Sequence, residues 1–90
     1  MTELSLKQSA LSDWFELTLK PTELNHAHDL MMPENKRIPY AQITGIFRDA
    51  GHCYVVWGAD VVRFLHEPGK REYENFMDQF LSRVRATRGA

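Results

Sequence analysis

Two histidines separated by one residue, His26 and His28, come closest in type and spacing to a metal site. On a β-strand, residues i and i+2 point to the same side, so the two imidazoles could share a zinc or nickel ion. On a helix the same positions diverge by about 200°, and the site is lost. Zinc usually takes four ligands, so His52, Cys53 or His66 would have to join the pair. We expect that the two histidines lie on a partly solvated strand or loop, with metal binding as the alternative.

The single cysteine and the acidic residues offer little for catalysis. Cys53 follows His52, but adjacent residues of a strand point to opposite faces, whereas a thiol nucleophile needs its base beside the sulfur. We predict that Cys53 is a small buried hydrophobic residue. The carboxylates of Glu72, Glu74 and Asp78 are typical of a solvated helix face. Because the sequence also contains no phosphate-binding glycine loop and no Gly-x-Ser-x-Gly, we expect neither an enzyme nor a cofactor.

The composition and the net charge indicate one globular domain whose surface carries no strong electrostatic field. The 90 residues include 11 Lys and Arg against 12 Asp and Glu, for a net charge of −1, and 43% are hydrophobic. A chain of this length forms a single domain with a small core. Because a nucleic-acid binder is expected to show a basic face, we do not expect a nucleic-acid partner.

The chain ends in a short basic segment that contains Arg83, Arg85 and Arg88, with no acid after Asp78. The simplest interpretation is that these charges complement the dipole at the end of a helix. The alternative is that they contact an anionic surface, such as RNA, DNA or a membrane.

The sequence also predicts where the protein resides. No apolar run approaches the roughly 20 residues of a membrane-spanning helix, so we expect no membrane span. The first residues carry an acid, Glu3, where a secretory signal would carry Lys or Arg. One cysteine cannot form an intramolecular disulfide. These features predict a cytoplasmic protein of bacterial or phage origin.

One amphipathic helix is predicted near the C-terminus, after Pro68-Gly69. Its apolar positions recur at i, i+3, i+4, i+7, i+8 and i+11, which is one stripe of an α-helix. They are Tyr73, Phe76, Met77, Phe80, Leu81 and Val84. Acids precede bases along the segment, which matches the helix dipole.

Alternating or apolar segments before this helix predict strands. They cover residues 14–20, 37–40, 43–48, 53–57 and 61–66. The last three, joined by short turns, form an antiparallel meander. Pro39 confines its strand to an edge or a strand end, and Gly45 marks a bulge or kink.

Two segments remain open between helix and strand. Residues 23–32 alternate in twos but also carry a helical stripe, and we favour the extended interpretation. Residues 1–12 fit a short strand, a helical turn or a frayed arm.

Several motifs follow a recognisable order. The strand at 15–19 with the segment 21–24 is similar to the opening of bacterial pleckstrin-homology-like domains. The segment 36–43, Lys-Arg-Ile-Pro-Tyr-Ala-Gln-Ile, is similar to the basic–aliphatic–Pro–aromatic lead into a strand of such domains. Residues 13–85 as a whole most resemble the YcxB-type C-terminal domain. This resemblance implies a binding scaffold and names no ligand.

The sequence therefore predicts an α+β fold. We expect a bent antiparallel sheet or partly open barrel of five or six strands, closed by one C-terminal helix in a PH-like arrangement. Residues 1–12 are assigned to an N-terminal arm and residues 13–90 to the single domain. The core between sheet and helix is expected to hold the large aromatic side chains. They are Phe47, Trp57, Phe64, Phe76 and Phe80.

The predicted function is non-catalytic protein binding, as an adaptor, inhibitor or regulatory module. A peptide could add to an open sheet edge near the proline-bearing strand, or two copies could pair as a homodimer. Trp14, Met31, Met32 and Tyr40 are the expected surface anchors, because aromatic rings and thioethers are enriched at interfaces. The competing interpretation is a second small core beneath residues 1–12.

Overall fold

The structure, a computed structural model, describes residues 3–10, 13–29 and 34–88. Its elements in chain order are β1 (Leu4–Ala10), β2 (Asp13–Leu19), β3 (Glu23–His28), β4 (Glu34–Pro39), the short 3₁₀ helix η1 (Tyr40–Gln42), β5 (Ile43–Arg48), β6 (His52–Trp57), β7 (Asp60–Leu65) and α1 (Arg71–Arg88).

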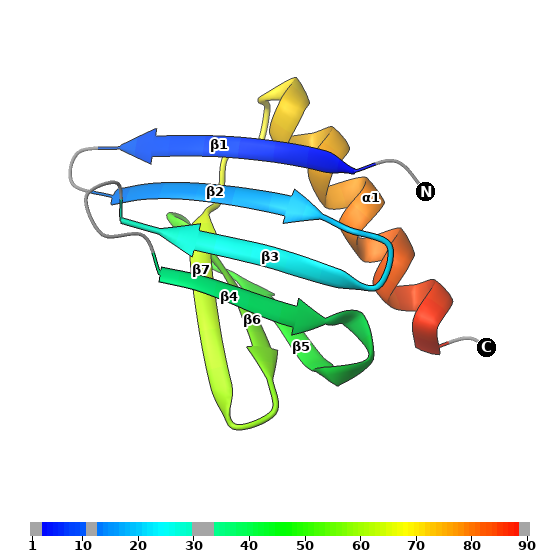
Figure 1. The fold of residues 1–90 in the computed structure, drawn as a ribbon. Coiled ribbons are helices and arrows are strands. Elements are labelled where there is room, and N and C mark those ends of the chain that lie inside the picture. The colour runs from blue at the N-terminus through cyan, green and yellow to red at the C-terminus, as the bar shows by residue number, and fades with distance from the viewer. Residues whose placement is uncertain (1–2, 11–12, 30–33, 89–90) are drawn as a thin grey trace.

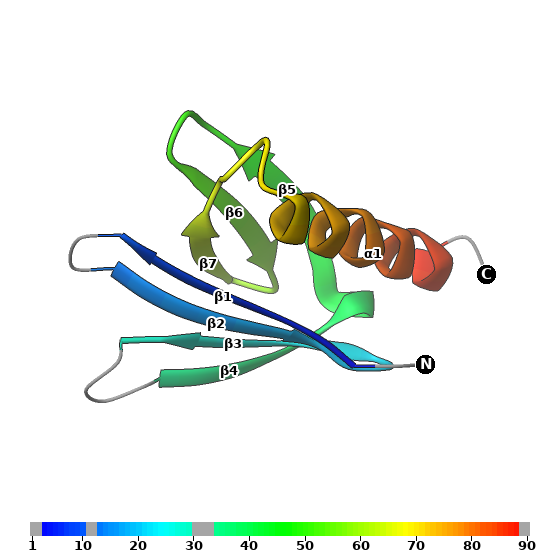
Figure 2. The same ribbon diagram turned by 90° about the horizontal axis from the view of Figure 1, so that it is seen from above.

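The strands form two antiparallel sheets that are not closed into a barrel. One sheet has the order β1-β2-β3-β4 and the other β5-β6-β7. Every neighbour in each sheet is also the next strand along the chain, so both sheets are meanders. The sheets lie at an angle to each other, and α1 packs beside them (Figures 1 and 2). The arrangement is roughly that of a pleckstrin-homology-like domain.

The core lies between the two sheets and the helix. In β2, Phe15, Leu17 and Leu19 are completely buried, while the residues between them are partly exposed. This alternation is the period of a strand with one face on the core. In β6, Cys53 and Val55 are buried in the same way. This confirms the prediction of a small buried cysteine, and burial raises the pKa of the Cys53 thiol to about 11.

The C-terminal helix lies where the apolar period predicts it. Its buried side chains are Tyr73, Phe76, Met77, Phe80, Arg83 and Val84. The rings of Phe76 and Phe80 lie 6.3 Å apart, and Phe76 meets Phe64 of β7 edge-on at 6.4 Å. Burial of such rings gives the largest contributions to a small core. The α1 helix therefore packs against the three-stranded sheet through an aromatic contact.

The predicted α+β class is confirmed, whereas the described part of the chain contains seven strands instead of the five or six expected. The difference arises at the N-terminus, because Leu4–Ala10 pairs along its whole length with β2. Of the segment 23–32, for which the extended interpretation was favoured, residues 23–28 form a strand, and residues 30–32 lie outside the described residues. Pro39 ends β4, an edge strand, and the register of β5 shifts between Ile43 and Gly45, where a bulge was predicted.

Two aromatic residues do not lie where the sequence predicts them. Tyr40, expected at the surface, is 1% exposed, because η1 turns its ring toward Phe80 and its hydroxyl donates to the Lys20 carbonyl (2.6 Å). Phe47, expected in the core, is 60% exposed. It follows the β5 bulge and pairs with half-buried Tyr54, on the sheet face that turns away from the core.

Candidate functional site

The outer edge of β7 is closed by a glutamine from the other sheet. The Gln8 side-chain Nε2 donates to the Leu65 carbonyl (2.8 Å), and the Leu65 N–H donates to Gln8 Oε1 (2.9 Å). Gln8 is 3% exposed. Its carboxamide thus pairs with β7 as the backbone of another strand would, and it satisfies two backbone groups that burial would otherwise leave unpaired.

A histidine closes the same edge two residues earlier. His26 Nε2 lies 2.7 Å from the Arg63 carbonyl oxygen, and because a carbonyl only accepts, Nε2 carries the proton. Burial lowers the pKa of His26; the hydrogen bond to Arg63 opposes that shift, and the charges of His28 and Lys36 add to it. Together with Gln8, His26 connects the two sheets at the β7 edge.

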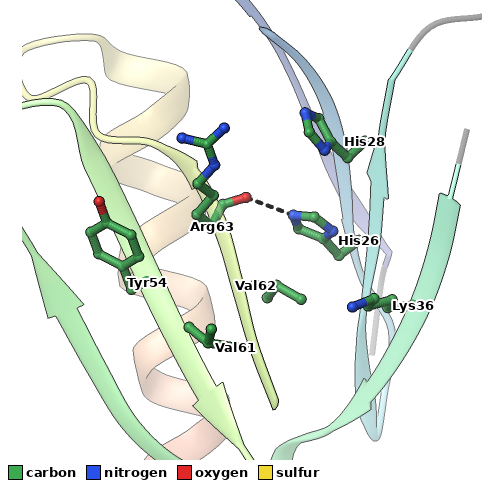
Figure 3. A pocket seen from close by; sticks show the side chains of 7 residues that line it. All are labelled: His26, His28, Lys36, Tyr54, Val61, Val62 and Arg63. Atoms are coloured by element: carbon green, nitrogen blue, oxygen red, sulfur yellow. Dashed lines mark hydrogen bonds between the residues drawn. The ribbon is translucent and has the colours of Figure 1, made fainter.

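A pocket opens beside this contact, between the face of β3 and β4 and the strands β6 and β7 (Figure 3). Its volume is about 260 Å³. The lining residues are His26, His28, Lys36, Tyr54, Val61, Val62 and Arg63. Among these described residues, every ionisable side chain except the Tyr54 phenol is basic, and two valines supply an apolar wall. We call this the inter-sheet pocket.

His26 and His28 share this pocket, as their spacing on a strand predicts. The His28 ring stacks on Phe15 with centroids 4.6 Å apart and planes 12° from parallel. In residues 3–10, 13–29 and 34–88, no cluster of three or more His, Cys, Asp or Glu side chains could hold a metal ion. Cys53 lies in the core and His66 bonds to Tyr73 (2.7 Å), so neither completes the set.

The predicted partner-binding residues do not form one surface. Trp14 is half-buried on β2, and its carbonyl accepts from the Asp29 N–H (3.1 Å). Met31 and Met32 lie outside the described residues. Tyr40 belongs to the core. Their predicted role in partner binding stays a prediction for Trp14 and the methionines, and burial removes its basis for Tyr40.

The three C-terminal arginines are also separated. Arg83 is 8% exposed and its Nη1 donates to the Lys20 carbonyl (3.4 Å), whereas Arg85 and Arg88 are exposed. Position 83 follows Phe76 and Phe80 on the buried stripe of α1, at i+7 and i+3. The alternative that all three cations contact an anionic surface therefore has its exposed cations only at Arg85 and Arg88 and stays a prediction.

A second hollow, the β5–α1 groove, lies between the end of β5 and one face of α1. It has a volume of about 350 Å³. It is lined by Arg48, His66, Pro68, Tyr73, Glu74, Met77, Asp78 and Leu81. Burial raises the pKa of the Tyr73 hydroxyl to about 12, and this hydroxyl bonds to His66 Nδ1. Tyr73, Met77 and Leu81 recur every four residues, so they form one apolar strip along the helix.

The sequence interpretation missed Gln8 and the β5–α1 groove. Gln8 carried a usable signal, because Leu4, Leu6 and Gln8 alternate and a polar residue then continues the inward face of a strand. The groove had no signal, because Arg48 and the α1 residues that line it are distant in sequence.

Comparisons with known proteins found no counterpart: no family model, no curated protein and no solved structure matches this chain. Within the part of the chain that the structure describes, no helix has the length and apolar character needed to cross a membrane.

Proposed function

We propose that this protein is a non-catalytic protein-binding module that takes an extended peptide at the outer edge of β5, beside α1. The observation that carries the proposal is that β5 borders an open groove, while the opposite edge of its sheet is closed. A peptide that adds to a strand edge gains backbone hydrogen bonds, and a neighbouring groove receives alternate side chains.

The backbone of β5 presents hydrogen-bonding groups to this edge. The hairpin closes with the Asp49 N–H donating to the His52 carbonyl (3.0 Å). In an antiparallel pair, successive residues alternate between facing the partner and facing outward. Phe47 therefore faces β6, and the backbone groups of Ile46 and Arg48 face the open edge.

The other strand edges are less suited to a peptide. On β7, Gln8 occupies both outer backbone groups of Leu65 and His26 occupies the Arg63 carbonyl. The opposite sheet has its edges at β1, which packs against α1, and at β4. The β4 strand carries two cations and ends at Pro39, features that protect natural edges from pairing.

The groove also indicates what the peptide carries. Met77 and Leu81 offer apolar contact, while the lining carboxylates of Glu74 and Asp78 outnumber the single guanidinium of Arg48. Asp78 is exposed and forms no hydrogen bond or ion pair within the described residues. A peptide that alternates apolar with Lys or Arg side chains fits this lining best.

Two synthetic ten-residue peptides test the proposal, one alternating Val with Lys and the other alternating Val with Glu. We expect the Lys peptide to shift the backbone NMR signals of β5 and of the α1 residues that line the groove. Its affinity should exceed that of the Glu peptide by roughly tenfold, equivalent to about 1.4 kcal/mol. Shifts confined to β1 or β4 would contradict the proposal.

Two variants at Arg48 distinguish the contribution of its backbone N–H to peptide binding from the contribution of its side-chain charge. Arg48→Pro removes an N–H that faces the open edge and should weaken binding of the Lys peptide by roughly tenfold. Arg48→Gln keeps the N–H and removes the charge, so it should bind at least as well as the parent chain. Equal affinities of the two variants, both folded by circular dichroism, would exclude strand addition at β5.

A second copy of the chain is the competing occupant of the same edge. Light scattering over a range of concentrations should show a monomer that binds peptide, whereas a dimer that excludes the peptide would contradict the proposal. We also propose that the protein is cytoplasmic and that it is related to YcxB-type domains. A role as a binding scaffold is compatible with both proposals.

A further inference from the structure

The inter-sheet pocket is preorganised by contacts that do not involve a ligand. One lining side chain, His26, is 5% exposed and is fixed by the Arg63 carbonyl. The His28 ring is fixed in orientation by stacking on Phe15. Side chains that are already ordered lose less entropy when they bind, which favours a specific small ligand.

The lining combines positive charge with an apolar wall. Among the described residues that line the pocket, Lys36 and Arg63 supply two cations and none is a carboxylate, while Val61 and Val62 supply the wall (Figure 3). The nearby acid Asp60 holds Lys36 Nζ at 3.2 Å, with side chains 36% and 50% exposed. Such exposed ion pairs contribute little, so Lys36 can turn toward a ligand anion.

We propose that the inter-sheet pocket binds a small organic acid, with its carboxylate beside Lys36, Arg63 and the His28 ring. The body of the acid lies against Val61 and Val62. The pocket volume of about 260 Å³ falls just below the roughly 300–1,000 Å³ of drug-sized sites, which favours a small molecule. Asp60 already balances part of the Lys36 charge. A ligand with one negative charge therefore suits the pocket better than a phosphate, which carries about two.

This site is independent of the proposed peptide site, because the residues that line the pocket and those that line the groove do not overlap. A ligand in the pocket is therefore expected to leave binding of the Lys peptide unchanged. Failure of either proposal leaves the other standing.

Titration of the full ¹⁵N-labelled chain with benzoate tests the inference. We expect saturable shifts of the amide signals of residues 26–28, 36 and 61–63. Benzamide has the same shape without the charge and should bind at least about tenfold more weakly, because charged hydrogen bonds are the stronger ones. Equal binding of benzamide, or shifts located at the β5–α1 groove, would overturn the inference.

Two variants and a second anion complete the test. Lys36→Gln should weaken benzoate binding about tenfold. The control Lys7→Gln removes an exposed lysine whose ion pair with Glu16 lies outside the pocket (3.8 Å), and it should change nothing. If Lys36→Gln unfolds, Arg63→Gln replaces it with the same expectation. Saturable binding of inorganic phosphate without binding of benzoate would overturn the assignment to a carboxylate.

Discussion

Gln8 and Leu65 exchange two hydrogen bonds across 57 positions of the chain, with the Gln8 carboxamide acting as donor to the Leu65 carbonyl and as acceptor from its N–H. Gln8 lies on β1 and Leu65 at the end of β7, so this pair connects the outermost strands of the two sheets. The pair closes an edge that would otherwise be open to strand addition.

Replacing Gln8 with Leu should destabilise the protein by about 2–3 kcal/mol, because both backbone groups of Leu65 then stay buried and unpaired. Urea denaturation measures the loss. Ser9→Ala, at the exposed neighbouring position of β1, is the control and should stay within about 0.5 kcal/mol of the parent chain. A Gln8→Leu chain as stable as the parent would show that this pair does not hold the sheets together.

The free energy of unfolding should fall in mild acid because of the protonation of His26. Its pKa is lowered in the folded chain, first by burial, so the unfolded state takes up a proton at higher pH than the folded state does. The stabilisation is therefore complete above the unfolded value of 6.5 and is lost progressively as the pH falls from there through the lower folded-state value.

Chemical denaturation at pH 7.5, 6.5 and 5.5 measures this effect. His26→Gln cannot titrate, so its free energy of unfolding should change less over this interval. Lowered pKa values at Asp49 and Asp60 act only near or below 3.8, outside the interval. An identical pH dependence for the variant and the parent chain would assign the effect to other groups.

Removal of the Tyr40 hydroxyl should lower the free energy of unfolding only modestly. In Tyr40→Phe the ring still packs against Phe80, and the Lys20 carbonyl still accepts from Arg83. We expect a loss of about 1 kcal/mol, the usual net contribution of one hydrogen bond. Tyr40→Ala removes the buried ring and should cost about 3–5 kcal/mol or prevent folding. Thermal unfolding of both variants distinguishes a core residue from a surface anchor, at which either change would be nearly neutral.

Phe47 should contribute little to stability despite its size. Because its ring is mostly exposed, Phe47→Ser is expected to change the free energy of unfolding by less than about 0.5 kcal/mol. Phe64→Ser is the matched comparison, since Phe64 is fully buried on β7, and it should unfold the chain or destabilise it by several kcal/mol, of the order of about 3–5. Similar losses for both variants would place Phe47 in the core after all.

The thiol of Cys53 should be unreactive in the folded chain. It is completely buried, and its pKa of about 11 leaves almost no thiolate at pH 8. A coloured disulfide reagent should label one thiol quickly in 6 M urea and only slowly in buffer. Rapid labelling of the native chain would show that β6 is accessible or opens frequently.

The local elements were predictable because each depends on nearby residues. The stripe from Tyr73 to Val84 specifies a helix, and the alternation from Phe15 to Leu19 specifies a strand, whatever the rest of the chain does. Both periods depend only on backbone geometry. The bulge at Gly45 was predictable for the same reason.

The candidate sites were not predictable, because they join residues that only the packing of the two sheets brings together. The sequence indicates that His26 and His28 share a face of a strand; it does not show that the Arg63 carbonyl, 37 positions away, accepts a hydrogen bond from His26. Phe47 was expected in the core and is exposed, whereas Tyr40 was expected at the surface and is buried. The reason is that exposure depends on which face of an element packs against another element. A residue's own type determines the elements it favours, while its surroundings are determined by the long-range contacts that fold the chain.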